Sequence, residues 1–330
     1  MTFSNVCGHG TPYHQLARTE AHRWWRPLVG TGGILCAFFS TGVIALSLET
    51  VLYGISEGTF TGLDLDAPGP TPIFGNTVLD ELFSAALAVL VLLAMLLAVF
   101  AVAKEAQKRP PGTLSSVTAR LRWRWLAVCL ALAAGFCAVL VGAALVVDFS
   151  VDGSAIADTM NSEVTTSGWG QAAELLQLIL WIVLAEYIFR GWFLQAVGAC
   201  TLETARGPVG SALSVVFRTP WPAIVISAAL FAWTVGYDGA GELDLFVFAV
   251  IAGWVAVQTG GLEASIALAV VYLVGLGLKT ENGDDPPWPQ VITIGAAVLF
   301  AAATAWLARR QHIETVSAAP GTVLISRTSQ

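Results

Sequence analysis

Long apolar segments separated by polar connections dominate the sequence. A transmembrane α-helix needs about 20 predominantly apolar residues, and a helix satisfies its own backbone polar groups inside lipid. By this criterion the pattern predicts eight helices. The first four and the last are long, whereas the fifth, sixth and seventh are short enough to be tilted or buried within a bundle. The predicted segments are residues 28–48, 82–103, 125–147, 170–194, 221–237, 245–258, 262–278 and 291–308.

The distribution of basic residues tests this helix count. Cytoplasmic connections of membrane proteins are enriched in lysine and arginine. If the N-terminus is cytoplasmic, 14 of the 16 basic residues fall in cytoplasmic connections or tails, and the intervening connections are acidic. The two exceptions are Arg190, inside the fourth apolar segment, and Lys279. We therefore expect an all-α, polytopic membrane bundle of about eight transmembrane helices, with both termini cytoplasmic.

Composition agrees with a membrane location. Only 12% of the residues are charged, 56% are hydrophobic, and the mean hydropathy is +0.72, whereas soluble domains carry about 25% charged residues. We expect the lipid bilayer of a cell (plasma or inner) membrane as the main partner, and no nucleic acid. The basic connection 104–124 is expected to contact anionic lipid headgroups. The helices contain no cluster of metal-ligating residues, so we expect no metal and no other cofactor.

One charge pair interrupts the fourth apolar segment, in the stretch LAEYIFRGWFLQ (184–195). Glu186 and Arg190 are four residues apart, which places them on one face of a helix. An ion pair of this kind can simply lower the cost of inserting two charges into lipid. Alternatively, ionisable residues inside membranes mark functional sites. Both interpretations predict that the two side chains lie together.

The same stretch resembles the first motif of the CPBP family, which includes the CAAX proteases and the bacteriocin-processing or abortive-infection endopeptidases. That motif is Glu-Glu-x-x-x-Arg, commonly with Phe before and Gly after the Arg, as at Phe189 and Gly191 here. The second family motif, Phe-x-x-x-His, aligns with ISAALFAWTVG (226–236), where Phe231 is its phenylalanine. The third, His-x-x-x-Asn, aligns with QTGGLEASIALAVVYL (258–273). The resemblance implies motifs on the fourth, fifth and seventh of eight helices, around a cavity that faces the cytoplasm.

This sequence departs from the family at the residues that carry the chemistry. The first glutamate of the family falls on Ala185, and the histidine of the second motif falls on Val235. The histidine and asparagine of the third motif fall on Ala269 and Leu273. Only Glu186 and Arg190 match. All four histidines of the chain, His9, His14, His22 and His312, lie in the terminal tails.

Amide hydrolysis in this family implies an activated water and an oxyanion site, and alanine, valine and leucine can supply neither. We therefore expect a catalytically inactive relative that binds a prenylated or hydrophobic peptide or another membrane protein. A second possibility is an active endopeptidase that uses Glu186 with other carboxylates, namely Glu174, Asp238 or Glu263. A third is a small-molecule transporter. Any remaining catalytic role would fall to Glu186, and the Glu186–Arg190 pair would organise the cavity.

The expected organisation follows from these segments. The chain begins with a cytoplasmic tail and three helices and continues into a CPBP-like core of helices 4 to 7. It closes with one loop, a last helix and a disordered tail. The corresponding ranges are 1–26, 27–168, 169–278, 279–310 and 311–330.

Overall fold

Helices make up most of the backbone that the structure describes. The computed structural model describes residues 10–19, 22–56, 74, 76–151, 168–200, 215–236, 240–277 and 288–317. Each of the eight predicted apolar segments is a helix within this part of the chain, which confirms the all-α bundle. The eight are α1 (Arg26–Ser56), α2 (Thr77–Glu105), α3 (Trp123–Val151), α5 (Gly168–Glu186), α8 (Trp221–Val235), α9 (Ala240–Thr259), α10 (Glu263–Gly277) and α11 (Trp288–Arg310).

Three helices extend well beyond the predicted apolar segments, because α1 ends at Ser56, α2 begins at Thr77 and α9 begins at Ala240. Among the described residues, six helices are long and apolar enough to cross a membrane, and α8 and α10 are shorter. The sixth predicted segment was too short. Helix α9 begins at Ala240 and includes Glu242 and Asp244 in its first turns, so a search for uninterrupted apolar residues misses its start.

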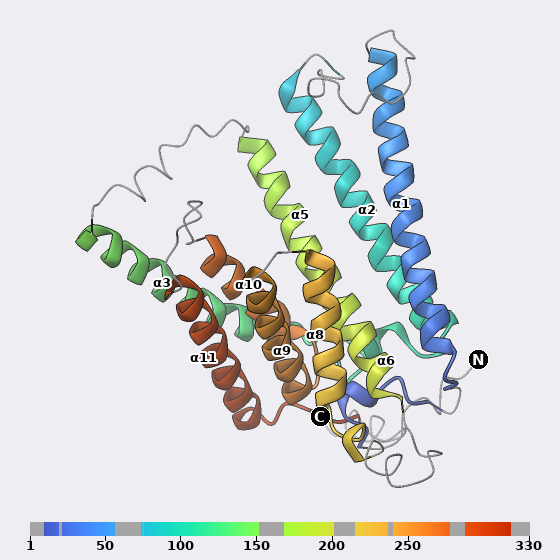
Figure 1. Ribbon diagram of the computed structural model, residues 1–330, viewed down its shortest axis with the longest axis vertical. Helices are drawn as coiled ribbons and strands as arrows, with labels where there is room; N and C mark the ends of the chain where they lie inside the picture. The colour runs from blue at the N-terminus through green and yellow to red at the C-terminus, as the bar shows by residue number, and fades with distance from the viewer. Residues whose placement is uncertain are drawn as a thin grey trace, which may run out of the picture.

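The helices form two groups that meet at α5. Helix α2 packs between α1 and α5, while α8, α9, α10 and α11 pack on one another and α3 packs on α10 and α11. In Figure 1, α1, α2 and α5 lie side by side, and α8 to α11 lie beside them with α3 at the far edge. Any site between α5 and the helices α8 to α11 is therefore formed by segments that are far apart in the sequence.

The fourth predicted helix is not a regular α-helix along its whole length. Helix α5 ends at Glu186 and continues as a π-helical turn, η3 (Tyr187–Phe193), and then as the short helix α6 (Leu194–Gly198). A π-helical turn changes which side chains share a face, and such turns are frequent at functional sites. Arg190 lies inside this turn, and Glu186 immediately precedes it.

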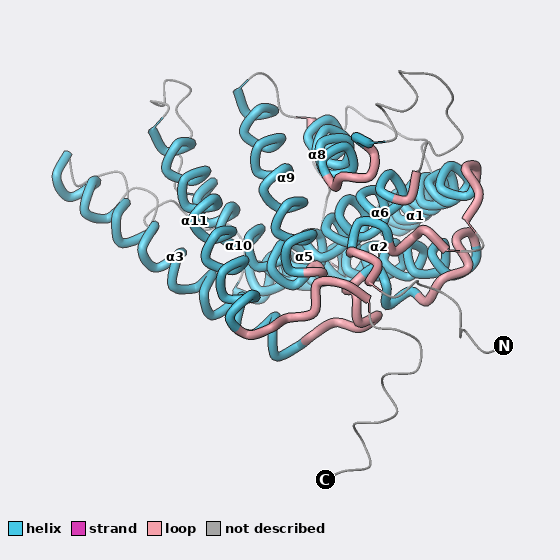
Figure 2. The backbone as a smooth tube through the Cα atoms, turned by 90° about the horizontal axis from the view of Figure 1, so that it is seen from below, coloured by secondary structure: helices cyan, strands magenta, loops and turns pink. Residues whose placement is uncertain are grey.

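Connections from four parts of the chain pack together at one end of the bundle. The segment between α2 and α3, which contains the 3-10 helix η2 (Pro111–Leu114), exchanges backbone hydrogen bonds with the α9–α10 turn. Val117 donates to the Gly260 carbonyl, and Leu262 donates to the Ser115 carbonyl, each at 2.9 Å. Figure 2 shows the described loops gathered at this end of the molecule. We call this structure the loop cap.

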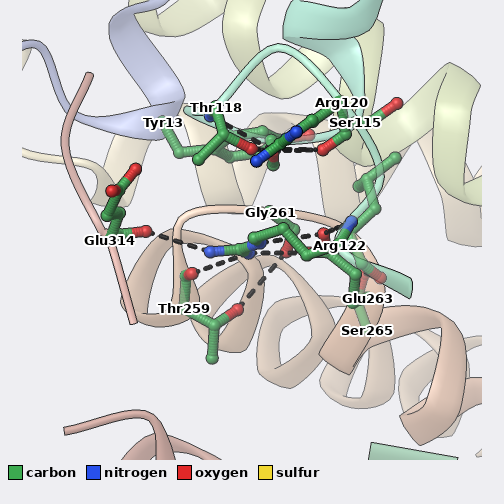
Figure 3. Close-up of polar contacts among 12 residues, drawn as sticks. Tyr13, Ser115, Thr118, Arg120, Arg122, Thr259, Gly261, Glu263, Ser265 and Glu314 are labelled. Carbon is green, nitrogen blue, oxygen red and sulfur yellow. Dashed lines mark hydrogen bonds and ion pairs between the residues drawn. The ribbon is translucent and has the colours of Figure 1, made fainter. Parts of the chain in front are cut away.

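The Arg122 side chain holds the loop cap together (Figure 3). Its guanidinium forms a salt bridge of 2.7 Å with Glu263, whose side chain has no exposed surface. The same guanidinium donates to the carbonyls of Thr259 and Glu314, each at 3.0 Å. The backbone N–H of Arg122 also donates to Glu263 Oε1. One arginine therefore connects α3, the α9–α10 turn and the segment that follows α11.

The two tails are part of the same cap. Pro12 and Val316 form an antiparallel bridge, and hydrogen bonds of 3.0 and 2.9 Å join Gly10 and Thr11 to Ser317. The expectation of disorder from residue 311 onward is therefore wrong for 311–317. The pairing also places the described ends of both tails on one side of the bundle, as the charge pattern required.

A glycine turn permits this approach. Gly260 has φ +68°, a left-handed conformation that favours glycine. A Cβ at this position would come within 2.7 Å of the Glu314 carbonyl oxygen and 2.8 Å of Thr315 Cα. The α9–α10 turn can therefore pack against the C-terminal segment only if residue 260 lacks a side chain.

The basic connection 104–124 is more deeply packed than its charge suggested. Arg109 is fully buried and donates to the side chains of Gln107, Thr113 and Gln195. Arg122 forms a salt bridge with the buried Glu263. Contact with anionic headgroups remains an expectation for the exposed Lys104, Lys108, Arg120 and Arg124, but two of the six basic side chains bind within the protein instead.

Burial in the cap also sets the charge of two N-terminal side chains. Burial raises the pKa of Tyr13 well above its ordinary value, so its hydroxyl stays protonated and donates to the Leu114 carbonyl at 2.5 Å. Burial lowers the pKa of His14. A neutral imidazole is therefore the form that fits the buried position beside α6.

Removing Arg122 should destabilise the protein strongly. Arg122→Gln leaves Glu263 buried without its cation, which typically costs about 3–5 kcal/mol. We expect a clearly lower unfolding midpoint in detergent, and partial recovery in Arg122→Gln/Glu263→Gln. Lys108→Gln is the matched control, because the Lys108–Glu105 pair is exposed on both sides and should not move the midpoint. Equal midpoints for Arg122→Gln and Lys108→Gln would contradict the role of Arg122.

Candidate functional site

A small apolar cavity lies between α5, α8, α9 and α10. Its volume is about 100 Å³, which is roughly the space of three water molecules in the liquid. Every position where the sequence departs from the family motifs contributes to its wall. The lining residues are Trp181, Ile182, Ala185, Glu186, Phe231, Val235, Leu245, Phe248, Ala269, Tyr272 and Leu273.

Glu186 and Arg190 form a buried ion pair at this cavity. Arg190 Nη1 lies 3.1 Å from Glu186 Oε1, and the two side chains are 1% and 2% exposed. Within the described part of the chain, Glu186 Oε2 and both Nη nitrogens of Arg190 have no hydrogen-bond partner. The pair thus compensates its charges but leaves one acceptor and two donor nitrogens without hydrogen bonds.

Aromatic rings surround the guanidinium. The Arg190 guanidinium carbon lies 4.6 Å from the centre of the Phe231 ring and 5.6 Å from that of Phe248. Phe231 also packs edge-on against Phe189, with ring centres 5.2 Å apart. A cation over an aromatic face is attracted by the ring's electron density, most strongly where water is excluded. The rings therefore stabilise a charge that hydrogen bonds only partly satisfy.

A second polar pair borders the cavity, and sequence reasoning did not find it. The Tyr272 hydroxyl donates to Asp244 Oδ2 at 2.9 Å, and the Tyr272 ring stacks on Phe248 with centres 4.1 Å apart. The sequence placed Asp244 in an exposed acidic connection, but the residue is 8% exposed. Asp244 and Tyr272 are 28 residues apart, and no motif links them.

The other candidate carboxylates do not join this site. Glu263 is not in the cavity wall, and its carboxylate accepts three hydrogen bonds from Arg122. Glu174 lines a different cleft, with Glu49 and Gln177, between α1, α2 and α5. Trp181 lines both that cleft and the cavity. Asp238 lies outside the described residues.

The cavity lies away from the loop cap. Phe231 and Val235 are near the C-terminal end of α8, and Leu245 and Phe248 are near the N-terminal end of α9. The loop cap contacts the opposite end of α9, at Thr259. On α8 and α9, the lining residues therefore lie in the halves of these helices that are further from the loop cap. The structure also adds α9, the sixth helix, to the three expected ones.

A comparison with protein families identifies this part of the chain. Residues 169–274, about a third of the length, match the family described as type II CAAX prenyl endopeptidase Rce1-like. The match includes α5, α8, α9 and most of α10, which are all the helices that line the cavity. Searches of curated proteins and of solved structures gave no significant match.

The chain is therefore an integral membrane protein that is CAAX-protease-like over residues 169–274. This result confirms the resemblance that Glu186, Arg190 and their neighbours carry in the sequence.

The Glu186–Arg190 pair can be tested by a double-mutant cycle. Glu186→Gln or Arg190→Met alone leaves one buried charge unpaired, which typically costs about 3–5 kcal/mol. Each single variant should therefore lower the unfolding midpoint clearly. The double variant strands no charge and should recover much of the loss. The measurement is thermal unfolding of purified protein in one detergent.

Additive losses in the double variant would mean that the two side chains do not interact. Single variants as stable as the wild type would assign the pair to ligand binding and not to stability. Lys108→Gln serves again as the control for the loss of an exposed charge.

Proposed function

We propose that this protein binds a prenylated or hydrophobic peptide in the cavity and does not hydrolyse it. One observation supports this most strongly. The four positions that hold glutamate, two histidines and asparagine in the family line a single cavity, and here they are Ala185, Val235, Ala269 and Leu273. The side chains that differ from the family motifs are therefore concentrated in the wall of one cavity.

Hydrolysis would need a general base and a donor for the developing oxyanion. Alanine, valine and leucine side chains can do neither. Glu186 already faces Arg190 at 3.1 Å, so the one matching carboxylate is engaged in an ion pair. These features favour binding without turnover.

The cavity has the chemistry of a binding site for an apolar group joined to an amide. Its wall is mainly aliphatic and aromatic, and its size suits one side chain or the end of a lipid chain. Glu186 is part of the wall, and its Oε2 has no hydrogen-bond partner among the described residues, so it can accept a hydrogen bond. A peptide group offers a matching N–H. We further infer that the protein resides in the cell membrane with its termini in the cytoplasm, in line with the charge distribution.

Filling the cavity should weaken binding. Ala269→Leu places extra methyl groups in the cavity wall, whereas Ala131→Leu adds the same groups on the exposed face of α3. We expect Ala269→Leu to reduce the affinity for a farnesylated CAAX peptide at least tenfold and Ala131→Leu to leave it unchanged. The measurement is fluorescence anisotropy of the labelled peptide with protein in lipid nanodiscs.

A non-prenylated peptide of the same sequence separates the contributions of the lipid and the peptide. Equal binding of the farnesylated peptide by the wild type and both variants, when both variants unfold at wild-type temperature, would contradict binding in this cavity.

A further inference from the structure

A third hollow, distinct from the cavity and from the cleft at Glu174, lies between α1 and α2 at the end of the bundle that carries the loop cap. Its volume is about 480 Å³. The walls are formed mainly by small apolar residues, whereas the charged residues lie at the rim. The residues around it are Trp25, Arg26, Val29, Gly30, Gly33, Ala101, Val102, Glu105, Ala106 and Lys108. We call it the α1–α2 groove.

The rim contains an arginine with two nitrogens that have no hydrogen-bond partner among the described residues. Nε and Nη1 of Arg26 are shielded from solvent, yet they have no hydrogen-bond partner in the described part of the chain. The nearest aromatic contact is the Trp25 ring, whose centre lies 5.6 Å from the guanidinium carbon. Lys108 and Glu105 pair with each other at 3.1 Å. The rim therefore has one net positive charge, and it belongs to Arg26.

The position of the groove relative to the bilayer follows from its tryptophans. Trp24 and Trp25 are 76% and 45% exposed at the start of α1, and tryptophan is enriched at membrane–water boundaries. Arg26 is the first residue of α1, and Gly30 and Gly33 lie one and two turns further along the same helix. The rim is thus at headgroup level, and the apolar walls run from there into the hydrocarbon.

We propose that the α1–α2 groove binds one anionic phospholipid. The phosphate or anionic headgroup accepts hydrogen bonds from Arg26, and one acyl chain lies along the apolar walls. A guanidinium–phosphate contact is charge-assisted, so a headgroup oxygen supplies an acceptor to a cation that has two nitrogens without one among the described residues. The occupant is assigned by charge complementarity and by the apolar walls below the rim. This proposal does not depend on the function proposed for the cavity.

Native mass spectrometry of detergent-purified protein tests the proposal directly. With added dioleoylphosphatidylglycerol, we expect one lipid to stay bound, and we expect dioleoylphosphatidylcholine to bind at least tenfold more weakly. Arg26→Gln should reduce phosphatidylglycerol binding about tenfold, because a charge-assisted hydrogen bond contributes on that scale. Arg124→Gln is the matched control, because Arg124 is exposed at the same end of the bundle and lies outside the groove.

A second pair of variants leaves Arg26 in place. Gly33→Leu puts a side chain into the groove, where even its Cβ would be 3.2 Å from Val102 Cγ2, whereas a Cβ at Gly32 meets nothing within 4 Å. Gly33→Leu should lose the bound lipid, and Gly32→Leu should keep it. Equal retention of both lipids by the wild type would overturn the proposal, as would retention unaffected by Arg26→Gln and Gly33→Leu. A dimer that persists after delipidation would place a second copy in the groove and would also overturn it.

Discussion

A guanidinium buried among apolar helices must be compensated by the protein itself, and Arg190 imposes this constraint on the whole domain. Its Nη1 lies 3.1 Å from Glu186, and the rings of Phe231 and Phe248 lie close to the cation. These partners come from α5, α8 and α9, so the charge can be stable only when the three helices have assembled. The cavity is the space beside this cluster.

The loop cap compensates a second buried charge, that of Glu263, at the end of the bundle. Glu263 begins α10 with no exposed surface, and Arg122 compensates it while also binding two carbonyl groups. The cap fixes the ends of α3, α9 and α10, and the cavity lies further along α9 and α10. The two arginines therefore stabilise different levels of the bundle, and α9 contacts both of them.

The sequence predicted the helices well because membrane helices must be long, apolar and internally hydrogen-bonded. The family motifs also align with Ala185, Val235, Ala269 and Leu273, and these four residues line one cavity in the structure. Contacts between distant polar residues were not predictable in this way. Nothing in the local pattern links Asp244 to Tyr272. Likewise, Arg122 was counted as a basic loop residue because charge alone does not reveal burial against Glu263.

The most direct test of the account is the rate at which the wild type cleaves a farnesylated CAAX peptide in liposomes. The reference is a variant with the family residues restored: Ala185→Glu, Val235→His, Ala269→His and Leu273→Asn. The account predicts no cleavage by the wild type above the rate of protein-free liposomes, and measurable cleavage by the restored variant if it folds. Cleavage by the wild type that disappears in Glu186→Gln would contradict it, because the surviving glutamate would then be catalytic.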